Sequence, residues 1–285
     1  MPLSQDVDFF LFCYTLKQMG KFKVLVAIPA YNCEKQIGRV LKGFDKALLD
    51  RVEKVIVIDD RGGDNTAKAA QEAIEKLGLP QPKVQVVQNV HNLGLGGSHK
   101  MAFLYGEKIG ADYVAILHGD DQAKAQELNN LLDVVDKDPS VGAILGCRFM
   151  KGSKLVGYSF QRTWGNRVIN IMYSIVAMRS SRDLGSGLNV FRLSDLSDHR
   201  YLGFDDRMTF NIDLLLDYFT KKTKIRFVPI TWQEEDQVTN ARNFNVAKIA
   251  TRQLLRWRFS KLPLAKHEAP EYQSIPYNKP GKQKD

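Results

Sequence analysis

The chain alternates short apolar runs with amphipathic stretches, and this alternation limits it to a parallel α/β architecture. Runs rich in Val and Ile predict buried strands, because a sheet covered on both faces needs apolar side chains throughout. The expected strands are residues 23–28, 52–59, 84–87, 113–117 and 141–146, with helices at 35–49, 64–77, 97–109 and 125–137. Strands and helices in this order form βαβ units around a mostly parallel sheet.

The second half of the chain departs from this alternation. It is predicted to hold a markedly apolar helix at residues 162–178, a strand at 188–191, a shorter helix at 211–219 and a strand at 224–229. We expect a main domain at residues 23–230, an accessory segment at 1–22, and a basic helix with an extended tail at 231–285. Residues 1–18 fit an ordinary N-terminal helix equally well, and they lack the basic leader of a secretory signal.

Charge and cysteine usage narrow the partners and the compartment. The 41 Lys and Arg outnumber the 32 Asp and Glu among 285 residues, and the net charge of +9 favours nucleotides, phospholipids or nucleic acid. Three scattered cysteines are too few for a disulfide scaffold or a cysteine-rich metal site, which indicates a reducing, cytoplasmic compartment. No run approaches about 18 apolar residues, so no membrane-spanning helix is expected.

Polar loops follow four of the predicted strands, at the edge of a parallel sheet where ligands bind. They cover residues 29–32, 59–64, 89–97 and 118–122. The pair Asp59-Asp60 can accept hydrogen bonds from a base or a ribose, although carboxylates at a strand end also serve turns. The glycines at 92–97 allow a ligand to approach the start of a helix, where anions are favoured. Their spacing is not that of a dinucleotide-binding motif.

The loop from His118 to Gln122 carries the metal prediction. Its carboxylate and amide oxygens are hard donors that suit Mg²⁺ or Mn²⁺ and leave positions for phosphate oxygens. His118, Asp120 and Gln122 project the same way if the loop stays extended, and an imidazole among them favours Mn²⁺. A solvated turn is the alternative interpretation.

Taken together, these loops resemble family 2 glycosyltransferases of the GT-A fold, over residues 23–229. The matching segments are residues 28–32, 57–60 with 64–66, 92–96 and 118–122. The segments 146–148 and 186–192 are similar to the acceptor side of polyprenyl (dolichyl) phosphate sugar transferases. The resemblance implies an α/β GT-A fold, in which helices flank a mostly parallel sheet with a Rossmann-like nucleotide-binding half and an acceptor half.

The resemblance implies a donor site built on the first two strands and the glycine-rich loop. Pro29, Tyr31 and Asp60 would border the nucleotide base, with Asp59 near the ribose. Gly94 would lie beside the nucleotide. The donor would be a UDP-, GDP- or dTDP-sugar.

The resemblance also implies how the diphosphate is held. Asp120 occupies the second acidic position of the family's DxD element, touching the metal and the diphosphate, and Gln122 matches a further metal ligand. The first DxD position is His118, so the choice between Mn²⁺ and Mg²⁺ stays open. Arg148 and Arg162 match basic positions that would hold phosphate, a task that suits planar guanidinium groups.

The acceptor decides whether a catalytic base is needed. A phosphate acceptor is already ionised near pH 7, because its second pKa is about 6, whereas a sugar hydroxyl needs a general base. Asp205 and Asp206 lie where the family often places its catalytic carboxylate, and they are preferred as candidates over Glu235 and Asp236. Exposed loop acids are the alternative interpretation of these four residues.

Two further segments are candidate acceptor contacts. Ser186 and Gly187 lie in the segment similar to the polyprenyl-phosphate enzymes. Gln253, Arg256 and Trp257 match the Q-x-x-R-W element of processive members such as cellulose and hyaluronan synthases, a match that chance could also produce. Those synthases carry transmembrane helices, which are not predicted here.

The same C-terminal stretch, residues 246–259, is predicted to be a basic amphipathic helix. Such helices lie on anionic membrane surfaces, and a helix packed on the domain with solvated arginines is the alternative. Because polyprenyl acceptors reside in membranes, we expect a cytoplasmic protein that is peripheral at the inner face of the membrane.

The resemblance implies an inverting hexosyltransferase that uses Mn²⁺ or Mg²⁺. It would move a sugar to a polyprenyl phosphate, or to a lipid-linked or cell-surface glycan in polysaccharide biosynthesis. One alternative is a sugar nucleotidyltransferase, which needs a Gly-rich basic loop where residues 29–32 stand. The other is a non-catalytic nucleotide-sugar or nucleic-acid binding protein, suggested by the basic tail, although nucleic acid is not the expected partner.

Overall fold

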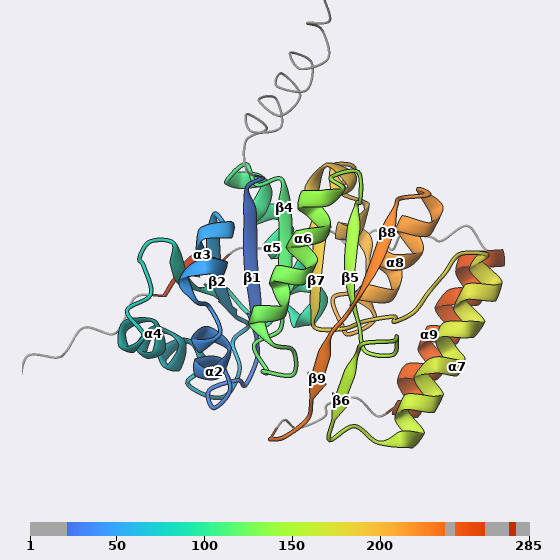
Figure 1. Cartoon of the computed structure of the whole chain (residues 1–285), viewed down its shortest axis with the longest axis horizontal. Helices are drawn as coiled ribbons and strands as arrows, with labels where there is room; N and C mark the ends of the chain where they lie inside the picture. The colour runs from blue at the N-terminus through green and yellow to red at the C-terminus, as the bar shows by residue number, and fades with distance from the viewer. Residues whose placement is uncertain (1–21, 237–242, 260–273, 278–285) are drawn as a thin grey trace, which may run out of the picture.

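A computed structural model describes residues 22–236, 243–259 and 274–277 of the chain. A central sheet runs through the molecule with helices on both sides (Figure 1). Its strands are β1 (Val24–Ala30), β2 (Lys54–Asp59), β3 (Val84–Asn89), β4 (Tyr113–Leu117), β5 (Ala143–Cys147), β7 (Leu188–Arg192), β8 (Ile225–Pro229) and β10 (Ser274–Pro276). This arrangement confirms the predicted α/β class.

The strand order is β10-β3-β2-β1-β4-β7-β5-β8. The four strands β3, β2, β1 and β4 are mutually parallel, and β5 is parallel to β8. β7 lies antiparallel between β4 and β5, and β10 is antiparallel to β3. Beyond this sheet, β6 (Lys154–Val156) pairs in parallel with β9 (Thr231–Gln233). The carboxyl ends of β1, β2 and β4 therefore meet at one edge.

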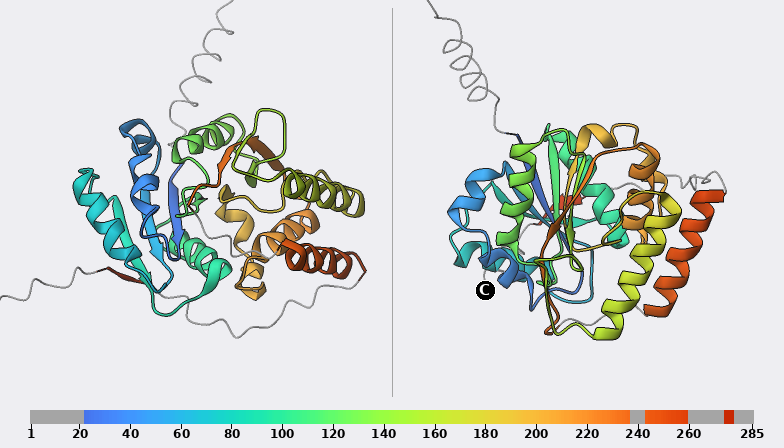
Figure 2. Two further views of the ribbon diagram at one scale, coloured as in Figure 1. Left: turned by 90° about the horizontal axis from the view of Figure 1, so that it is seen from below. Right: turned by 45° about the vertical axis from the view of Figure 1, so that its right-hand side comes forward.

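Each face of the sheet is covered by its own helical layer (Figure 2). One layer holds α2 (Ile37–Lys42), α3 (Lys46–Arg51), α4 (Thr66–Lys76) and α6 (Leu128–Lys137). The other holds α5 (Gly94–Lys108), α7 (Phe160–Ala177), α8 (Phe210–Thr220) and α9 (Asn243–Phe259). Alternate residues of β1 point to opposite faces of the sheet. Val24 and Val26 pack in one core, and Leu25 and Ala27 pack in the other, so both faces are apolar.

Two predicted helices differ from those observed. The single helix expected at residues 35–49 is two helices, because Asp45 begins a new one by accepting a hydrogen bond from the Leu48 amide at 2.8 Å. The helix expected from residue 97 begins at Gly94. Short 3₁₀ turns precede α6 and follow β7, at Ala125–Glu127, Leu193–Leu196 and Arg200–Gly203.

The predicted flanking segments lie largely outside the described residues. Of the expected accessory segment at residues 1–22, only Phe22 is described, and its ring packs edge-on against Tyr113 at 5.4 Å. Of the tail after residue 259, residues 274–277 are described, and β10 adds to the sheet beside β3. Among the described helices, none combines the length and apolar character needed to cross a bilayer.

Candidate functional site

Backbone hydrogen bonds bring the predicted site loops together around the end of β1. The Asp60 amide, after β2, donates to the Ala30 carbonyl at 2.9 Å, and the Gly119 amide, after β4, donates to the Pro29 carbonyl at 2.9 Å. Because β1 lies between β2 and β4, the Asp59-Asp60 loop and the His118–Gln122 loop stand on either side of it. The two acid-bearing loops therefore lie at the same edge of the sheet, on either side of the end of β1.

The carboxylates of Asp59 and Asp60 are buried and bonded to the end of β3. The Asn89 side-chain amide and the Leu93 backbone amide donate to Asp60 Oδ1 at 2.6 and 2.8 Å, and Gln88 donates to Asp59 Oδ2 at 2.7 Å. Burial raises the pKa of both carboxyl groups, while these hydrogen bonds oppose the shift. The pair thus positions the β3–α5 connection as well as one side of the predicted base site, where Tyr31 is 47% exposed.

The glycine-rich turn at the start of α5 contacts protein. Gly94 has a φ of +73°, and a Cβ there would lie 2.6 Å from the Asp206 carbonyl oxygen. The Gly96 amide donates to the same oxygen at 2.7 Å. One turn later Lys100, whose side chain is 0% exposed, donates to Asp206 Oδ1 at 2.7 Å and to the Phe204 carbonyl. The N-terminus predicted to favour an anion therefore holds the Asp205-Asp206 segment, and a nucleotide contact at Gly94 stays a prediction.

We expect the substitution Gly94→Ala to lower the free energy of unfolding by about 2–4 kcal/mol, from left-handed backbone strain and the clash with Asp206. Gly78→Ala is the matched control, because Gly78 has a φ of +63° and a Cβ there would have no neighbour within 4 Å. The control should lose only about 1 kcal/mol. Urea denaturation of both variants measures the difference, and equal losses would show that the contact with Asp206 contributes nothing.

His118 is half-buried, and its ring packs against other residues of the protein. Its amide donates to the Gly187 carbonyl at 2.8 Å, and a Cβ on Gly187 would lie 2.9 Å from its Cγ. Its ring meets the His99 ring edge-on with centroids 5.7 Å apart. Burial, followed by the nearby Arg148 guanidinium, lowers the pKa of His118 to about 4, so the imidazole is neutral at pH 7. Its metal-ligand role remains a prediction.

Asp120 and Asp121 are adjacent but differently engaged. The Asp121 side chain is 8% exposed and pairs with Arg39 Nε at 2.8 Å and Lys124 Nζ at 3.4 Å, so it fixes the loop against α2. Asp120 accepts a hydrogen bond from the Gln122 amide at 3.2 Å, and burial raises its pKa to about 6. Of the two carboxylates, Asp120 is the better candidate for a ligand role.

The donor set of this loop fits a hard divalent cation that shares its coordination with a diphosphate. Asp120 and Gln122 would hold it through a carboxylate and a carboxamide, and Mg²⁺ is commonly bound through one or two carboxylates plus substrate phosphates. Within the part of the chain that the structure describes, no three His, Cys, Asp or Glu side chains gather as a metal cluster.

Both predicted phosphate-binding arginines are paired with acids. Arg148 forms a two-pronged pair with Asp183, with Nε to Oδ2 at 2.9 Å and Nη2 to Oδ1 at 2.8 Å. Arg162 Nη1 lies 2.5 Å from a Glu234 carboxylate oxygen, over the ring of Tyr158. Asp183 and Glu234 are not predicted from the sequence, because no local spacing links acids 35 and 72 residues away to these arginines.

The Q-x-x-R-W residues of α9 are bonded to α8. Gln253 Nε2 donates to Asp213 Oδ1 at 2.9 Å, and Trp257 Nε1 donates to Thr220 Oγ1 at 2.9 Å. Burial raises the pKa of Asp213 to about 6, and the Asp205 backbone amide bonds to the same carboxyl group. The motif therefore supports the loop that carries the candidate bases, and direct acceptor contact remains a prediction.

The remaining acceptor-side candidates are placed as follows. Ser186 is buried, with its hydroxyl donating to the Leu188 carbonyl at 3.2 Å. Arg256 is exposed on α9. Asp236 pairs with Arg39 Nη2 at 2.9 Å, which joins the segment after β9 to α2. Arg39 of α2 thus links Asp236 to the His118–Gln122 loop, because it also pairs with Asp121.

The sheet order and the acid-bearing loops after β2 and β4 define a glycosyltransferase of the GT-A fold. Glucosyl-3-phosphoglycerate synthase from Mycobacterium tuberculosis, solved with UDP, has the same fold with a TM-score of 0.62 and 17% identity, covering 85% of this chain and 82% of that one. The complex of the same enzyme with Mn²⁺, UDP and glucosyl-3-phosphoglycerate has a TM-score of 0.59 and 16% identity, covering 85% of this chain and 80% of that one.

The family follows from the sequence match. Residues 25–200 match the model for glycosyl transferase family 2, and the chain belongs to this family. An uncharacterized protein of Methanocaldococcus jannaschii is 26% identical over 236 residues, 79% of this chain and 96% of that protein.

Two relatives have names that state a lipid-phosphate acceptor. The dolichol-phosphate mannosyltransferase of Pyrococcus furiosus is 24% identical over 169 residues, 59% of this chain and 45% of that enzyme. The dolichyl-phosphate beta-glucosyltransferase of Dictyostelium discoideum is 25% identical over 224 residues, 74% of this chain and 66% of that enzyme. The chain thus spans less than half of the first and about two thirds of the second.

Proposed function

We propose that this family 2 glycosyltransferase moves a sugar, with inversion, from a nucleoside-diphosphate sugar to a polyprenyl phosphate. The observation that carries the proposal is that the loop after β2, which holds Asp59 and Asp60, and the loop after β4, which holds Asp120 and Gln122, are both hydrogen-bonded to the end of β1. Relatives named for dolichyl phosphate and undecaprenyl phosphate support the acceptor class.

The donor nucleotide would lie across the ends of β1 and β2. Pro29 and Tyr31 would border its base together with Asp60, and Asp59 would accept a hydrogen bond from the ribose. The hydrogen bonds from β3 hold both carboxylates in place before the donor arrives. This preorganisation lowers the cost of ordering the site on binding.

The departing diphosphate develops negative charge, and the site must stabilise it. A Mn²⁺ or Mg²⁺ ion held by Asp120 and Gln122 would supply that charge compensation. His118, whose imidazole is neutral at pH 7, holds this loop through the hydrogen bond from its amide to the Gly187 carbonyl. Arg148 and Arg162 stay candidates for phosphate, each after exchange from its present carboxylate partner.

The candidate bases favour a phosphate acceptor over a hydroxyl. Asp206 is ion-paired with Lys100 at 2.7 Å, and Asp205 accepts a hydrogen bond from the Arg207 amide at 2.8 Å. Both carboxylates are thus already engaged by donors of the protein itself. A phosphate nucleophile needs no such base, so the arrangement fits in-line attack by a lipid phosphate.

A thermal-shift panel of UDP, GDP and dTDP, with and without Mn²⁺, tests the donor site. We expect one nucleotide with the metal to raise Tm by about 5 °C at saturation, since ligands that bind only the folded state stabilise it. The matching sugar nucleotide should then glycosylate a polyprenyl phosphate, detected as a lipid-soluble labelled product. No shift with any nucleotide, or transfer to glycans alone, would contradict the proposal.

We also propose that the enzyme is cytoplasmic and peripheral at the inner face of the membrane. The chain carries excess positive charge, with 41 basic against 32 acidic residues. Its acceptor in this proposal is a membrane lipid, which a peripheral enzyme would have to reach from the water side.

A further inference from the structure

α7 presents a continuous apolar stripe to solvent. Its exposed large apolar side chains recur every three or four residues and are 46–80% exposed. They are Phe160, Trp164, Val168, Ile171 and Ile175 in the helix and Met178 at its C-cap. On a helix with 3.6 residues per turn this spacing keeps the five helical residues on one face. The stripe therefore runs the whole length of α7, about 27 Å at 1.5 Å per residue.

The stripe lies opposite the face that α7 buries. Asn170, Tyr173 and Ala177 point into the protein, and the Tyr173 hydroxyl donates to the Ala250 carbonyl of α9 at 2.6 Å. A helix on the surface of a soluble protein normally turns its apolar side chains to the core and polar ones to water. Monomeric proteins rarely expose a contiguous apolar patch of this extent without a function.

α9 runs beside α7 along the same side of the molecule (Figures 1 and 2). It adds exposed apolar side chains at Ile249, Leu255 and Phe259. It also exposes four cationic residues, which are Lys248, Arg252, Arg256 and Arg258. Neither helix contains an Asp or a Glu. The exposed residues of the two helices, called here the α7–α9 face, thus combine apolar and positive groups without an acidic one.

We propose that the α7–α9 face docks on an anionic lipid bilayer, with the α7 stripe inserted among the headgroups and acyl-chain ends. Interfacial helices of this kind bind through buried apolar area together with attraction of Lys and Arg to anionic lipids. A second copy of this chain fits less well, because a symmetric dimer pairs a patch with itself and would oppose two positive faces.

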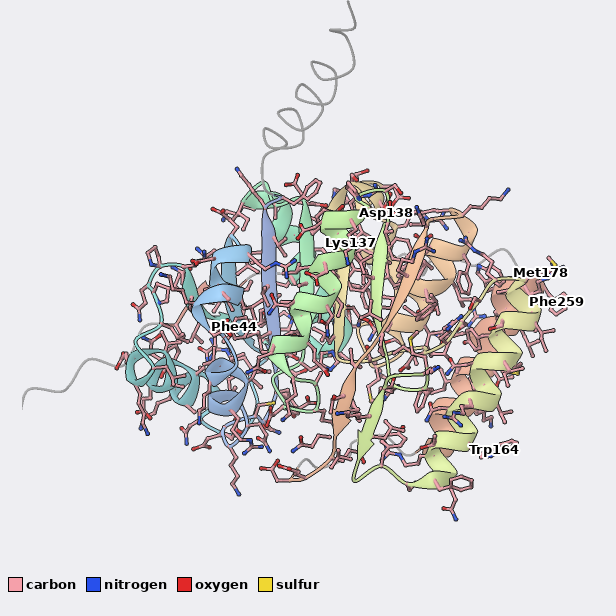
Figure 3. The ribbon with its side chains drawn as sticks, in the orientation of Figure 1. Phe44, Lys137, Asp138, Trp164, Met178 and Phe259 are labelled. Carbon is pink, nitrogen blue, oxygen red and sulfur yellow. The ribbon has the colours of Figure 1, made fainter. Side chains whose placement is uncertain are left out.

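The stripe begins at the edge of the molecule that carries the candidate site. Trp164 lies on the end of α7 near β6 and β9, whereas Met178 and Phe259 lie together at the far end (Figure 3). Arg162, in the first turn of α7, pairs with Glu234 directly after β9. A bilayer on the α7–α9 face would therefore bring lipid headgroups next to this end of the site.

This inference deepens the proposed peripheral location, and its test uses neither donor nor acceptor. The full chain is sedimented with vesicles of phosphatidylcholine containing 30 mol% phosphatidylglycerol, and with pure phosphatidylcholine vesicles. We expect binding to the anionic vesicles that weakens with added salt, as electrostatic attraction to lipid does. Failure of docking would leave sugar transfer to soluble short-chain acceptors intact, so the two proposals fail separately.

Matched variants identify the surface. Ile171→Gln/Ile175→Gln should weaken vesicle binding by about tenfold or more, through lost apolar burial. Leu77→Gln, which changes an exposed apolar residue directly after α4 in the opposite layer, should bind as the wild type does. Lys248→Gln/Arg252→Gln should lose about tenfold at 0.1 M salt. Lys68→Gln/Lys76→Gln, which removes two exposed cations from α4, should lose far less.

Several results would overturn the proposal. The first is equal binding of the wild type and Ile171→Gln/Ile175→Gln to anionic vesicles. The second is no vesicle binding at all, with folding confirmed by circular dichroism. The third is concentration-dependent dimerisation in sedimentation velocity that Ile171→Gln/Ile175→Gln abolishes, which would assign the stripe to a contact between copies.

Discussion

The substitution Asp120→Asn is expected to lower kcat/KM for sugar transfer by about 1,000-fold or more, because an amide cannot supply the charge that holds a diphosphate-bound cation. The same change should not destabilise the protein. Burial raises the pKa of Asp120 to about 6 from 3.8, so the ionised carboxylate is disfavoured in the folded state. That cost is absent at low pH, grows between about pH 4 and 6, and is complete above.

Asp120→Asn removes this cost, so its free energy of unfolding at pH 7 should equal or exceed that of the wild type by up to about 3 kcal/mol. At pH 3.5 the two proteins should be about equally stable. Urea denaturation at both pH values, with kinetics using the donor that the thermal-shift panel identifies, measures both effects. A variant that keeps wild-type kcat/KM would exclude Asp120 from the diphosphate site.

The neighbouring substitution Asp121→Asn is the matched control, and it should behave in the opposite way. Asp121 is buried and paired with Arg39 at 2.8 Å, so its loss should lower stability by about 1–3 kcal/mol. Its kcat/KM per folded molecule should stay within a few-fold of the wild type. If both variants lose activity equally, the loop acts as one unit and Asp120 has no separate role.

The parallel half of the fold was predictable because its signals are local. Continuous Val- and Ile-rich runs predicted β1, β2, β3 and β4, and these four strands are the parallel core of the sheet. The position of β7 between β4 and β5, antiparallel to both, has no local signal. It depends on which strand edges remain open once the first half has folded, and apolar periodicity does not report this.

The positions of the candidate site residues after strand ends could be predicted from the sequence, but the residues that pair with them could not. The strand pattern predicted that Asp60 and Asp120 follow the ends of strands, as they do after β2 and β4, because loops after parallel strands share one edge. The partner of Arg148 is Asp183, which lies 35 residues away, and no pattern of helix or strand spacing links the two. Long-range ion pairs follow from topology and appear only in the folded chain.

The glycine-rich turn at the start of α5 was predicted to bind an anionic ligand, but in the structure it binds another segment of the protein. The amides at the start of α5 do attract an oxygen, one that carries a partial negative charge. In the structure that oxygen is the Asp206 carbonyl, 2.7 Å from the Gly96 amide. The preference of a helix N-terminus for negatively charged groups can be predicted from local sequence. The loop that occupies it here comes more than a hundred residues later and could not be predicted in this way.

The second large effect is expected for Lys100→Met, which should lower the free energy of unfolding by about 3–5 kcal/mol. The Lys100 ammonium is fully buried and bonds to the Leu202 and Phe204 carbonyls and to the Asp206 carboxylate. Methionine keeps the length of the side chain but donates nothing, so two carbonyls and a carboxylate lose their donor. Lys108→Met, at the exposed end of the same helix, should change stability by less than about 0.5 kcal/mol.

A double-mutant cycle with Asp206→Asn separates the ion pair from the backbone contacts. If the unpaired Asp206 carboxylate accounts for much of the loss, Lys100→Met/Asp206→Asn should recover about 1–2 kcal/mol relative to Lys100→Met alone. Asp206→Asn itself should retain transfer to a polyprenyl phosphate, since a phosphate acceptor needs no base from this residue. Complete loss of transfer in folded Asp206→Asn would instead assign Asp206 as the general base and favour a hydroxyl acceptor. Equal stability of Lys100→Met and Lys108→Met would show that the buried ammonium does not hold the Asp205-Asp206 segment.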